Sequence, residues 1–109
     1  MKAIILALIL CESGFNPKAY NPAGRAKGLG QITRIAVKEA HRVCGLPLNP
    51  NLFNANTNLK YTECIYNYYR KISKSDVEAV IMYHAGFVGR EKFRQRKSPG
   101  PKTIVTGKL

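Results

Sequence analysis

The apolar run over residues 3–11 limits the fold of this 109-residue chain more than any other feature of its sequence. Nine residues are about half of the ~20 that a helix needs to cross a bilayer, so the run predicts a core helix rather than a membrane span. The residues that follow are Glu12, Ser13 and Gly14, and a glycine at this place is typical of a helix C-cap. We therefore expect a buried helix that is apolar all round and that has an acidic residue, Glu12, near its C-terminal end.

The same run has a second interpretation, as a short secretory signal or as a lipoprotein leader that ends at Cys11. A cleavage site requires small residues before the cut, but Leu8 and Leu10 occupy those positions. The basic segment in front of the run is also a single residue, Lys2. We therefore expect no cleavable signal peptide and favour the helix.

Helical spacing dominates the rest of the chain. Apolar residues recur every three or four positions over residues 31–43 and 58–72, which predicts two amphipathic helices. Residues 15–30 are crowded with Pro, Asn and Gly and predict a long ordered loop with neither helix nor strand. Strand signals are few, so the predicted fold class is all-α: a bundle of short helices with a long Gly/Pro-rich loop.

A capping box, the sequence SDVE at residues 75–78, predicts the start of a fourth helix. We expect this helix over residues 76–85, with its end at Gly86. The side chains that we expect to face inward are Val77, Val80, Ile81 and His84. Beyond Gly89 the apolar pattern gives way to charge.

The charge balance, 18 − 6 = +12, bears on partners more than on fold. Half of this excess comes from the C-terminal residues, where seven bases face one acid, Glu91. These bases are Arg90, Lys92, Arg94, Arg96, Lys97, Lys102 and Lys108. Two interpretations stay open: a solvated basic face, or a binding site for a polyanion such as nucleic acid, anionic lipid or an acidic wall polymer.

The three cysteines, Cys11, Cys44 and Cys64, form no metal-binding pattern and are too few for a disulfide scaffold. At least one is unpaired, and we expect all three to be small buried apolar residues. The sequence calls for no metal and no cofactor.

Six acids and two histidines supply the acid–base groups of the chain. Capping accounts for Asp76 and Glu78, and neighbouring bases or a polar helix face account for Glu39, Glu63 and Glu91. Glu12 has no such structural explanation, since it closes an apolar helix and leads into the Gly/Pro-rich loop. Burial there would raise its pKa toward the value that a general acid needs at neutral pH.

Four motifs follow one another along the chain: ESGFNP at residues 12–17, GLGQ at 28–31, NL at 58–59 and MYHAG at 82–86. They resemble, in the same order, the motifs Glu-Ser-x-Phe-x-Pro, Gly-Leu-Met-Gln, Asn-Ile/Leu and Ala-Tyr-Asn-Ala-Gly of the soluble lytic transglycosylase (SLT) domain, a lysozyme-like fold that cleaves peptidoglycan. The resemblance covers residues 5–95 and places the apolar run in the helix that delivers the catalytic acid.

The resemblance implies a mechanism and a set of site residues. Glu12 would protonate the glycosidic oxygen of the MurNAc-β-1,4-GlcNAc bond, then take the proton of the C6 hydroxyl as a 1,6-anhydro ring closes. Gln31 would bind sugar amide or hydroxyl groups, and Tyr83 would hold Glu12 or the substrate through its hydroxyl. His84 would donate to the acetamido carbonyl, with a charge that varies with pH, and Ser13 would support the site.

The chain departs from the family pattern at three of these positions. Gly30 replaces a methionine, which removes an apolar wall of the cleft. His84 replaces an asparagine, and Thr62 stands where the family often has glycine in its tyrosine-rich helix.

The expected organisation is an SLT-like catalytic domain over residues 1–95 and a basic tail over residues 96–109. We expect a monomer that acts on glycan strands in the periplasm or cell wall, with the tail bound to anionic wall polymers. A compact basic domain of this kind suits a bacteriophage or a secretion system.

Three other functions are weighed against this one. A muramidase of goose type would hydrolyse the same bond, but it would need an acid that activates water near Glu12. A non-catalytic wall-binding protein would keep the fold without turnover. Specific nucleic-acid binding is disfavoured, because Ala40, Gly45 and Pro47 do not fit the spacing of a helix-turn-helix.

Overall fold

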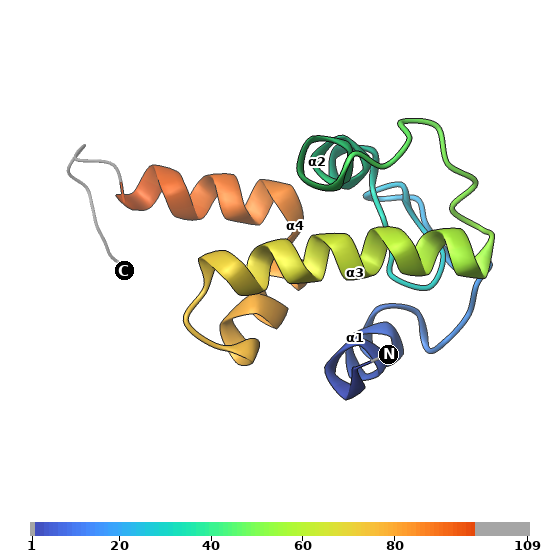
Figure 1. The fold of residues 1–109 in the computed structure, drawn as a ribbon, viewed down its shortest axis with the longest axis horizontal. Helices are drawn as coiled ribbons and strands as arrows, with labels where there is room; N and C mark the ends of the chain where they lie inside the picture. Colours follow the sequence, from blue (N-terminus) through green and yellow to red (C-terminus); the bar gives the residue numbers. More distant parts are fainter. Residues whose placement is uncertain (1, 98–109) are drawn as a thin grey trace.

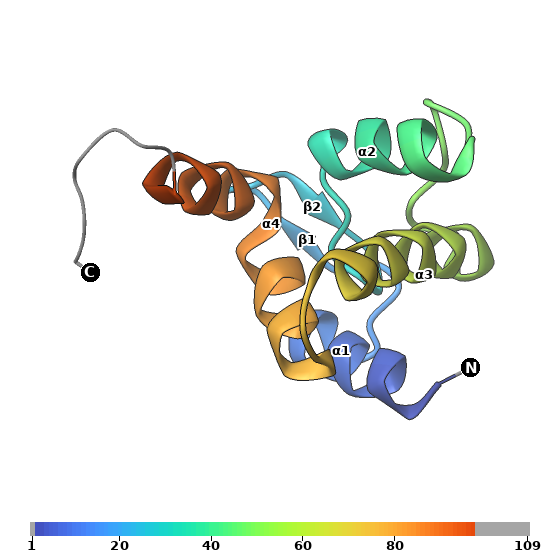
Figure 2. The ribbon, with the colours of Figure 1, turned by 60° about the vertical axis from the view of Figure 1, so that its left-hand side comes forward.

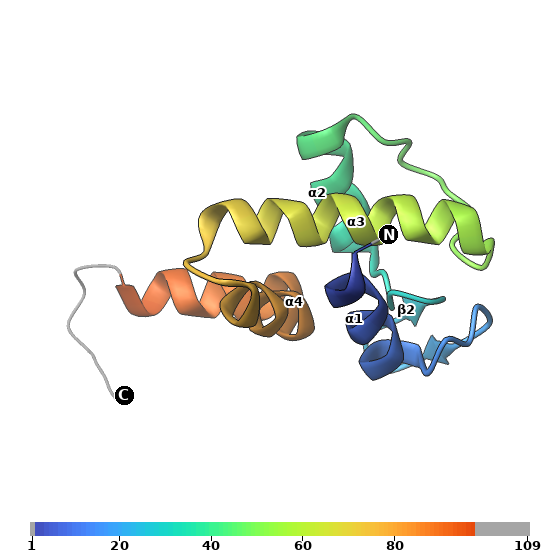
Figure 3. The same cartoon turned by 60° about the horizontal axis from the view of Figure 1, so that its bottom comes forward.

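The computed structural model describes residues 2–97, with the backbone alone for residues 87–97. In chain order the described elements are α1 (Ala3–Ser13), β1 (Tyr20–Asn21), β2 (Ala26–Lys27), α2 (Arg34–Cys44), α3 (Ala55–Ile72) and α4 (Asp76–Lys97). The long helix α3 crosses the middle of the molecule, with α1 and α2 on opposite sides of it (Figures 1 and 3). All three other helices pack against α3, so the predicted all-α bundle is confirmed.

Helix α1 ends where the sequence predicts. Gly14 adopts the left-handed conformation (φ 62°), and its N–H donates to the carbonyl of Leu10 at 3.0 Å. Ile5, Leu8 and Ile9 are buried in the core. The expectation that the helix is buried all round is wrong, because Leu6 and Leu10 are 44% and 58% exposed on its other face.

The predicted loop over residues 15–30 contains a short hairpin. Strands β1 and β2 pair antiparallel, with Tyr20 opposite Lys27 and Asn21 opposite Ala26 (Figure 2). Each strand has two residues, too few for an alternating apolar pattern that would predict a strand.

Helices α2 and α3 begin at capping residues, and their first residues differ from the predicted ones. Thr33 accepts from the Ala36 N–H at 3.1 Å, so α2 begins three residues later than residue 31. Asn54 accepts from the Thr57 N–H at 3.0 Å, so α3 begins three residues earlier than residue 58. The buried tyrosines of α3 are Tyr61, Tyr66 and Tyr69.

Helix α4 is interrupted at Gly86, whose φ of 73° and ψ of −171° are not helical. The predicted end is therefore confirmed as a break, but the backbone becomes helical again to Lys97, where the sequence showed only charge. Ser75 precedes the first half of α4, and its hydroxyl accepts from the Glu78 N–H at 3.1 Å, as the capping box predicts.

The predicted inner face of α4 is rotated from the observed one. Ala79 and Tyr83 are buried, whereas Val77 and Ile81 are 70% and 61% exposed. The apolar residues of this short segment lie all round the helix, so their spacing alone did not select the side that packs. His84, also predicted to face inward, has a side chain that is 73% exposed.

The interpretation of the cysteines as three buried apolar residues is wrong. Cys44 at the end of α2 and Cys64 in α3 form a disulfide, with Cα atoms 6.4 Å apart. Cys11 is a free thiol and is exposed. The fold brings together two cysteines that are 20 residues apart, a pairing that no local spacing indicates.

Within residues 2–97, none of the helices combines the length and the hydropathy that crossing a membrane requires. Most of the basic tail, residues 98–109, lies outside the described residues, while Arg96 and Lys97 form the end of α4.

Candidate active site

A pocket of about 240 Å³ lies beside the C-terminal end of α1. We call it the Glu12 pocket. Its lining includes four of the five residues that the sequence predicts for the site, namely Glu12, Gln31, Tyr83 and His84. Its walls come from the hairpin, the start of α2, α3 and the break in α4. The volume is below the ~300–1,000 Å³ typical of pockets for drug-sized ligands, so it suits one section of a longer molecule.

Glu12 is the acid of this pocket. Its side chain is 12% exposed, and Oε2 lies 3.0 Å from Nδ1 of His84. Burial disfavours the charged carboxylate and raises the pKa of Glu12, while the hydrogen bond and the charge of His84 oppose this rise. The net direction is upward, so the fold favours the protonated form that a general acid needs.

The other carboxyl groups with described contacts have partners outside the Glu12 pocket. Glu39 is buried and pairs with Arg42 at 2.5 Å, rather than lying on a solvated face as predicted. Asp76 accepts from Tyr66 at 2.6 Å and pairs with Arg70. Among the described residues, Glu12 contributes the only carboxyl group that lines the Glu12 pocket.

Ser13 does not line the pocket. Its hydroxyl lies 3.3 Å from the carbonyl oxygen of Ile9 and 2.8 Å from that of Leu29. The second contact joins the end of α1 to the loop that carries Gly28–Gln31. Ser13 thereby fixes Glu12 relative to Gln31.

Gln31 faces the pocket from a left-handed backbone conformation, with φ of 52°. Its Nε2 donates to the carbonyl oxygens of Gly28 at 3.0 Å and Ala19 at 3.3 Å. Both contacts use the amide nitrogen, so Oε1 is the atom left to accept from a ligand.

Tyr83 forms a buried wall of the pocket. Its hydroxyl donates to the carbonyl oxygen of Gly30 at 2.7 Å, rather than to Glu12. Burial raises the pKa of Tyr83, and the nearby Glu12 carboxylate raises it further, so the phenol stays neutral. Its ring packs edge-on against Tyr69, with centroids 6.4 Å apart.

Two departures from the family pattern, Gly30 and Thr62, contact each other. A Cβ placed on Gly30 would overlap Oγ1 of Thr62 and would lie 2.6 Å from the hydroxyl oxygen of Tyr83. The threonine side chain therefore occupies the space that a side chain at residue 30 would need. Relative to the family pattern, the chain therefore loses the methionine side chain at residue 30 and has a threonine side chain at residue 62, where the family often has glycine.

Asn58 positions the site, although the sequence analysis identified it only as part of a motif. It is fully buried, and its Oδ1 accepts from the Gly30 N–H at 2.8 Å. Its Nδ2 donates to the carbonyl oxygens of Lys27 and Leu52, each at 2.9 Å. A polar residue on the apolar stripe of α3 was the signal for this role.

Within the part of the chain that the structure describes, no group of three or more His, Cys, Asp or Glu side chains could hold a metal ion.

A mostly helical bundle of this kind, with a buried acid of raised pKa at the end of its first helix and a pocket bordered by a hairpin, defines a lysozyme-like domain. The family described as the Transglycosylase SLT domain matches residues 1–105. The chain therefore belongs to the SLT family, whose members are lytic transglycosylases that act on peptidoglycan. No curated protein and no solved structure matches the chain.

Proposed function

We propose that this chain is a peptidoglycan lytic transglycosylase that cleaves the MurNAc-β-1,4-GlcNAc bond and forms a 1,6-anhydro-MurNAc end. The observation that carries the proposal is the position of Glu12, a 12% exposed carboxyl group with a raised pKa, in a pocket with Gln31 and His84. A muramidase that hydrolyses the bond would need a second group to activate water. Among the residues whose side chains the structure describes, 2–86, the Glu12 pocket offers no second carboxyl group.

The reaction uses one carboxyl group twice. In the first step the Glu12 O–H gives its proton to the glycosidic oxygen, and the bond from C1 to that oxygen breaks. The substrate's own N-acetyl group stabilises the positive charge that develops at C1. In the second step the Glu12 carboxylate takes the proton of the C6 hydroxyl while the C6 oxygen bonds to C1. This step closes the anhydro ring and restores the protonated acid.

His84 holds Glu12 between these steps. With Oε2 and Nδ1 3.0 Å apart, the pair shares one proton: the Glu12 O–H donates to neutral Nδ1, or a protonated Nδ1 donates to the carboxylate. The second ring nitrogen, Nε2, is left for the acetamido carbonyl of the sugar, since the imidazole is largely exposed. Gln31 accepts from a sugar N–H or O–H through Oε1.

The disulfide supports action outside the cytoplasm. Disulfides such as Cys44–Cys64 persist in the periplasm and outside the cell, and are rare in the reducing cytosol. This bond therefore favours the periplasm or the cell wall as the place of action and disfavours a cytoplasmic nucleic-acid-binding protein. We also propose that the basic residues beyond Gly89 attract anionic wall polymers, in keeping with the net charge of +12.

Digestion of purified peptidoglycan tests the proposed function. We expect released muropeptides with 1,6-anhydro ends by mass spectrometry, and loss of release with Glu12→Gln. The same variant should still pellet with peptidoglycan, because it keeps the shape of the pocket. Reducing ends alone would identify a muramidase, and unchanged release by Glu12→Gln would exclude Glu12 as the acid.

A further inference from the structure

A second pocket, larger than the Glu12 pocket, lies on the other face of the hairpin. Its volume is about 590 Å³, and Tyr20 and Lys27 line it. These two residues pair across the hairpin, as do Asn21 and Ala26, which line the Glu12 pocket. Because successive residues of a strand point to opposite faces, the hairpin separates the two pockets.

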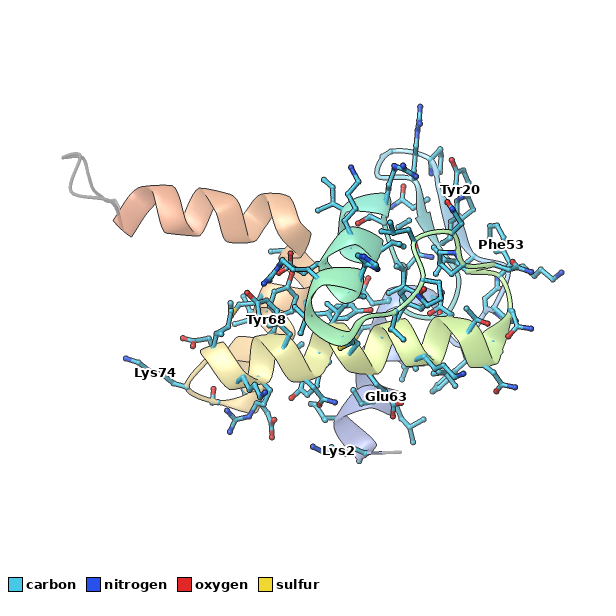
Figure 4. The ribbon with its side chains drawn as sticks, turned by 45° about the horizontal axis from the view of Figure 1, so that its top comes forward. Lys2, Tyr20, Phe53, Glu63, Tyr68 and Lys74 are labelled. Carbon is cyan, nitrogen blue, oxygen red and sulfur yellow. A yellow bond between two sulfur atoms is a disulfide. The ribbon has the colours of Figure 1, made fainter. Side chains whose placement is uncertain are left out.

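The second pocket has an apolar floor. Ile32, Val37 and Leu52 are buried, with exposures of 1%, 4% and 7%. Leu48 and Pro50, from the connection between α2 and α3, form a wall, and Asn49 adds a polar side chain there. In Figure 4, Tyr20 and Phe53 are labelled at the end of the molecule away from the second half of α4.

The rim of this pocket is cationic. Arg25, Lys27 and Arg34 line it without an accompanying carboxyl group. None of the three side chains makes an ion pair or a hydrogen bond with another described residue. Three like charges around one cavity repel each other and create a positive potential that an anion would relieve. We call this site the cationic pocket.

We propose that the cationic pocket binds an acidic peptide. The inference rests on the proposed function in one respect: in the wall, the ligand would be the carboxylate-bearing peptide that branches from the glycan strand held at Glu12. Ile32 lines both pockets, so they adjoin, and a branch could reach round the hairpin from one to the other.

The composition of the pocket favours a peptide over a phosphate polymer. The two arginines and the lysine match carboxylates, and arginine binds them through paired N–H donors. The apolar floor needs aliphatic side chains in contact with it, and the Asn49 amide matches backbone amides. A polyol phosphate would supply the negative charge but no aliphatic group for the floor.

Binding of a free acidic peptide tests the proposal without any turnover. The probe is a synthetic peptide of the wall's branch, with two free carboxylates and alanine side chains, titrated into the full chain by fluorescence anisotropy. We expect binding that weakens at high salt, and a loss of about tenfold for each of Arg25→Gln and Arg34→Gln, since each removes a charge-assisted hydrogen bond. Both side chains are exposed, so thermal melting should be unchanged.

Matched variants make the test specific. Lys38→Gln with Lys60→Gln removes the same charge from exposed sites outside the pocket and should leave peptide affinity within twofold of the wild type. An equal loss in this control would overturn the proposal in favour of general attraction to cationic surface. Binding of poly(glycerol phosphate) in the pocket, with none of the peptide, would also overturn it.

The same variants separate this inference from the proposed function. On peptide-bearing peptidoglycan, Arg25→Gln with Arg34→Gln should raise KM about tenfold or more while leaving kcat unchanged. On glycan strands stripped of their peptides the pair should have no effect. Pocket-dependent peptide binding by a chain that cleaves no wall would support this inference and refute the transglycosylase proposal. Cleavage of both substrates with no pocket-dependent binding would do the reverse.

Discussion

The carboxyl group of Glu12 and the imidazole of His84 form one hydrogen-bonded pair, with 3.0 Å between Oε2 and Nδ1, across 72 residues of sequence. The partners differ in environment, since the acid is 12% exposed and the histidine side chain 73%. Burial raises the pKa of Glu12, and His84 opposes the rise. The working range of the acid therefore depends on two opposed effects, one set by packing and one by a residue that departs from the family pattern.

Replacement of His84 by asparagine should move the pH profile of the proposed transglycosylase activity. Without the imidazole, the influence that lowers the pKa of Glu12 is lost, so this pKa rises and the acid stays protonated to higher pH. We expect the alkaline limb of kcat/KM, measured on purified peptidoglycan, to shift upward in His84→Asn. The control is His41→Asn, which changes a histidine outside the Glu12 pocket and should keep the wild-type profile. A downward shift in His84→Asn would contradict the assigned role.

Replacement of Glu12 by glutamine should stabilise the fold while it abolishes turnover. Because burial raises the pKa of Glu12 in the folded state, ionisation costs more there than in the unfolded chain. This cost is absent at acidic pH, below the unfolded pKa, and develops as pH rises through the folded pKa. Denaturant titrations should therefore show a higher free energy of unfolding for Glu12→Gln at neutral pH, and little difference at acidic pH. A variant that is less stable at neutral pH would contradict this expectation.

The sequence predicted the parts of the site that local signals specify. The end of α1 at Gly14 and the break at Gly86 both follow from glycine and from apolar runs, and both were confirmed. Long-range pairing left no such signal. The contact of Ser13 with Leu29 and the hydrogen bond of Tyr83 to Gly30 join residues 16 and 53 positions apart, and only the fold reveals them.

The missed features have the same origin. The two strands of the hairpin have two residues each, too few for periodicity, and the Cys44–Cys64 bond depends on how α2 packs against α3. The inner face of α4 was predicted to include Val77 and Ile81, but Ala79 is the residue that is buried. Apolar residues lie all round this segment, so hydrophobic spacing does not determine which side packs against the core.

The contact of Gly30 with Thr62 predicts a strongly coupled pair. Gly30→Ala places a Cβ against the threonine hydroxyl and should lower the free energy of unfolding by about 1–3 kcal/mol, the usual cost of overpacking. Adding Thr62→Gly should recover part of this loss, with a coupling energy of about 0.5–3 kcal/mol in a double-mutant cycle. The control is Gly24→Ala, where a Cβ meets nothing within 4 Å. Additive effects of the two substitutions would contradict the contact.

The basic tail, residues 96–109, predicts a salt-dependent affinity for the wall. Truncation after Gln95 removes four bases, Arg96, Lys97, Lys102 and Lys108. Because salt screens exposed charges, the truncation should weaken pelleting with wall fragments more at low salt than at high salt. Equal loss at both salt concentrations, with a lower melting temperature, would indicate a folding role instead.

Loss of the Cys44–Cys64 bond should destabilise the domain without touching the site chemistry. In the chain-entropy account, a link across 20 residues contributes about 3 kcal/mol, because it restricts the unfolded chain. Reduction, or Cys44→Ser with Cys64→Ser, should lower the melting temperature, while activity per folded molecule at low temperature is kept. Cys11→Ser changes the free thiol on α1 and should leave melting unchanged, which serves as the matched control. Equal melting of the reduced and oxidised chain would show that packing of α2 on α3 suffices without the bond.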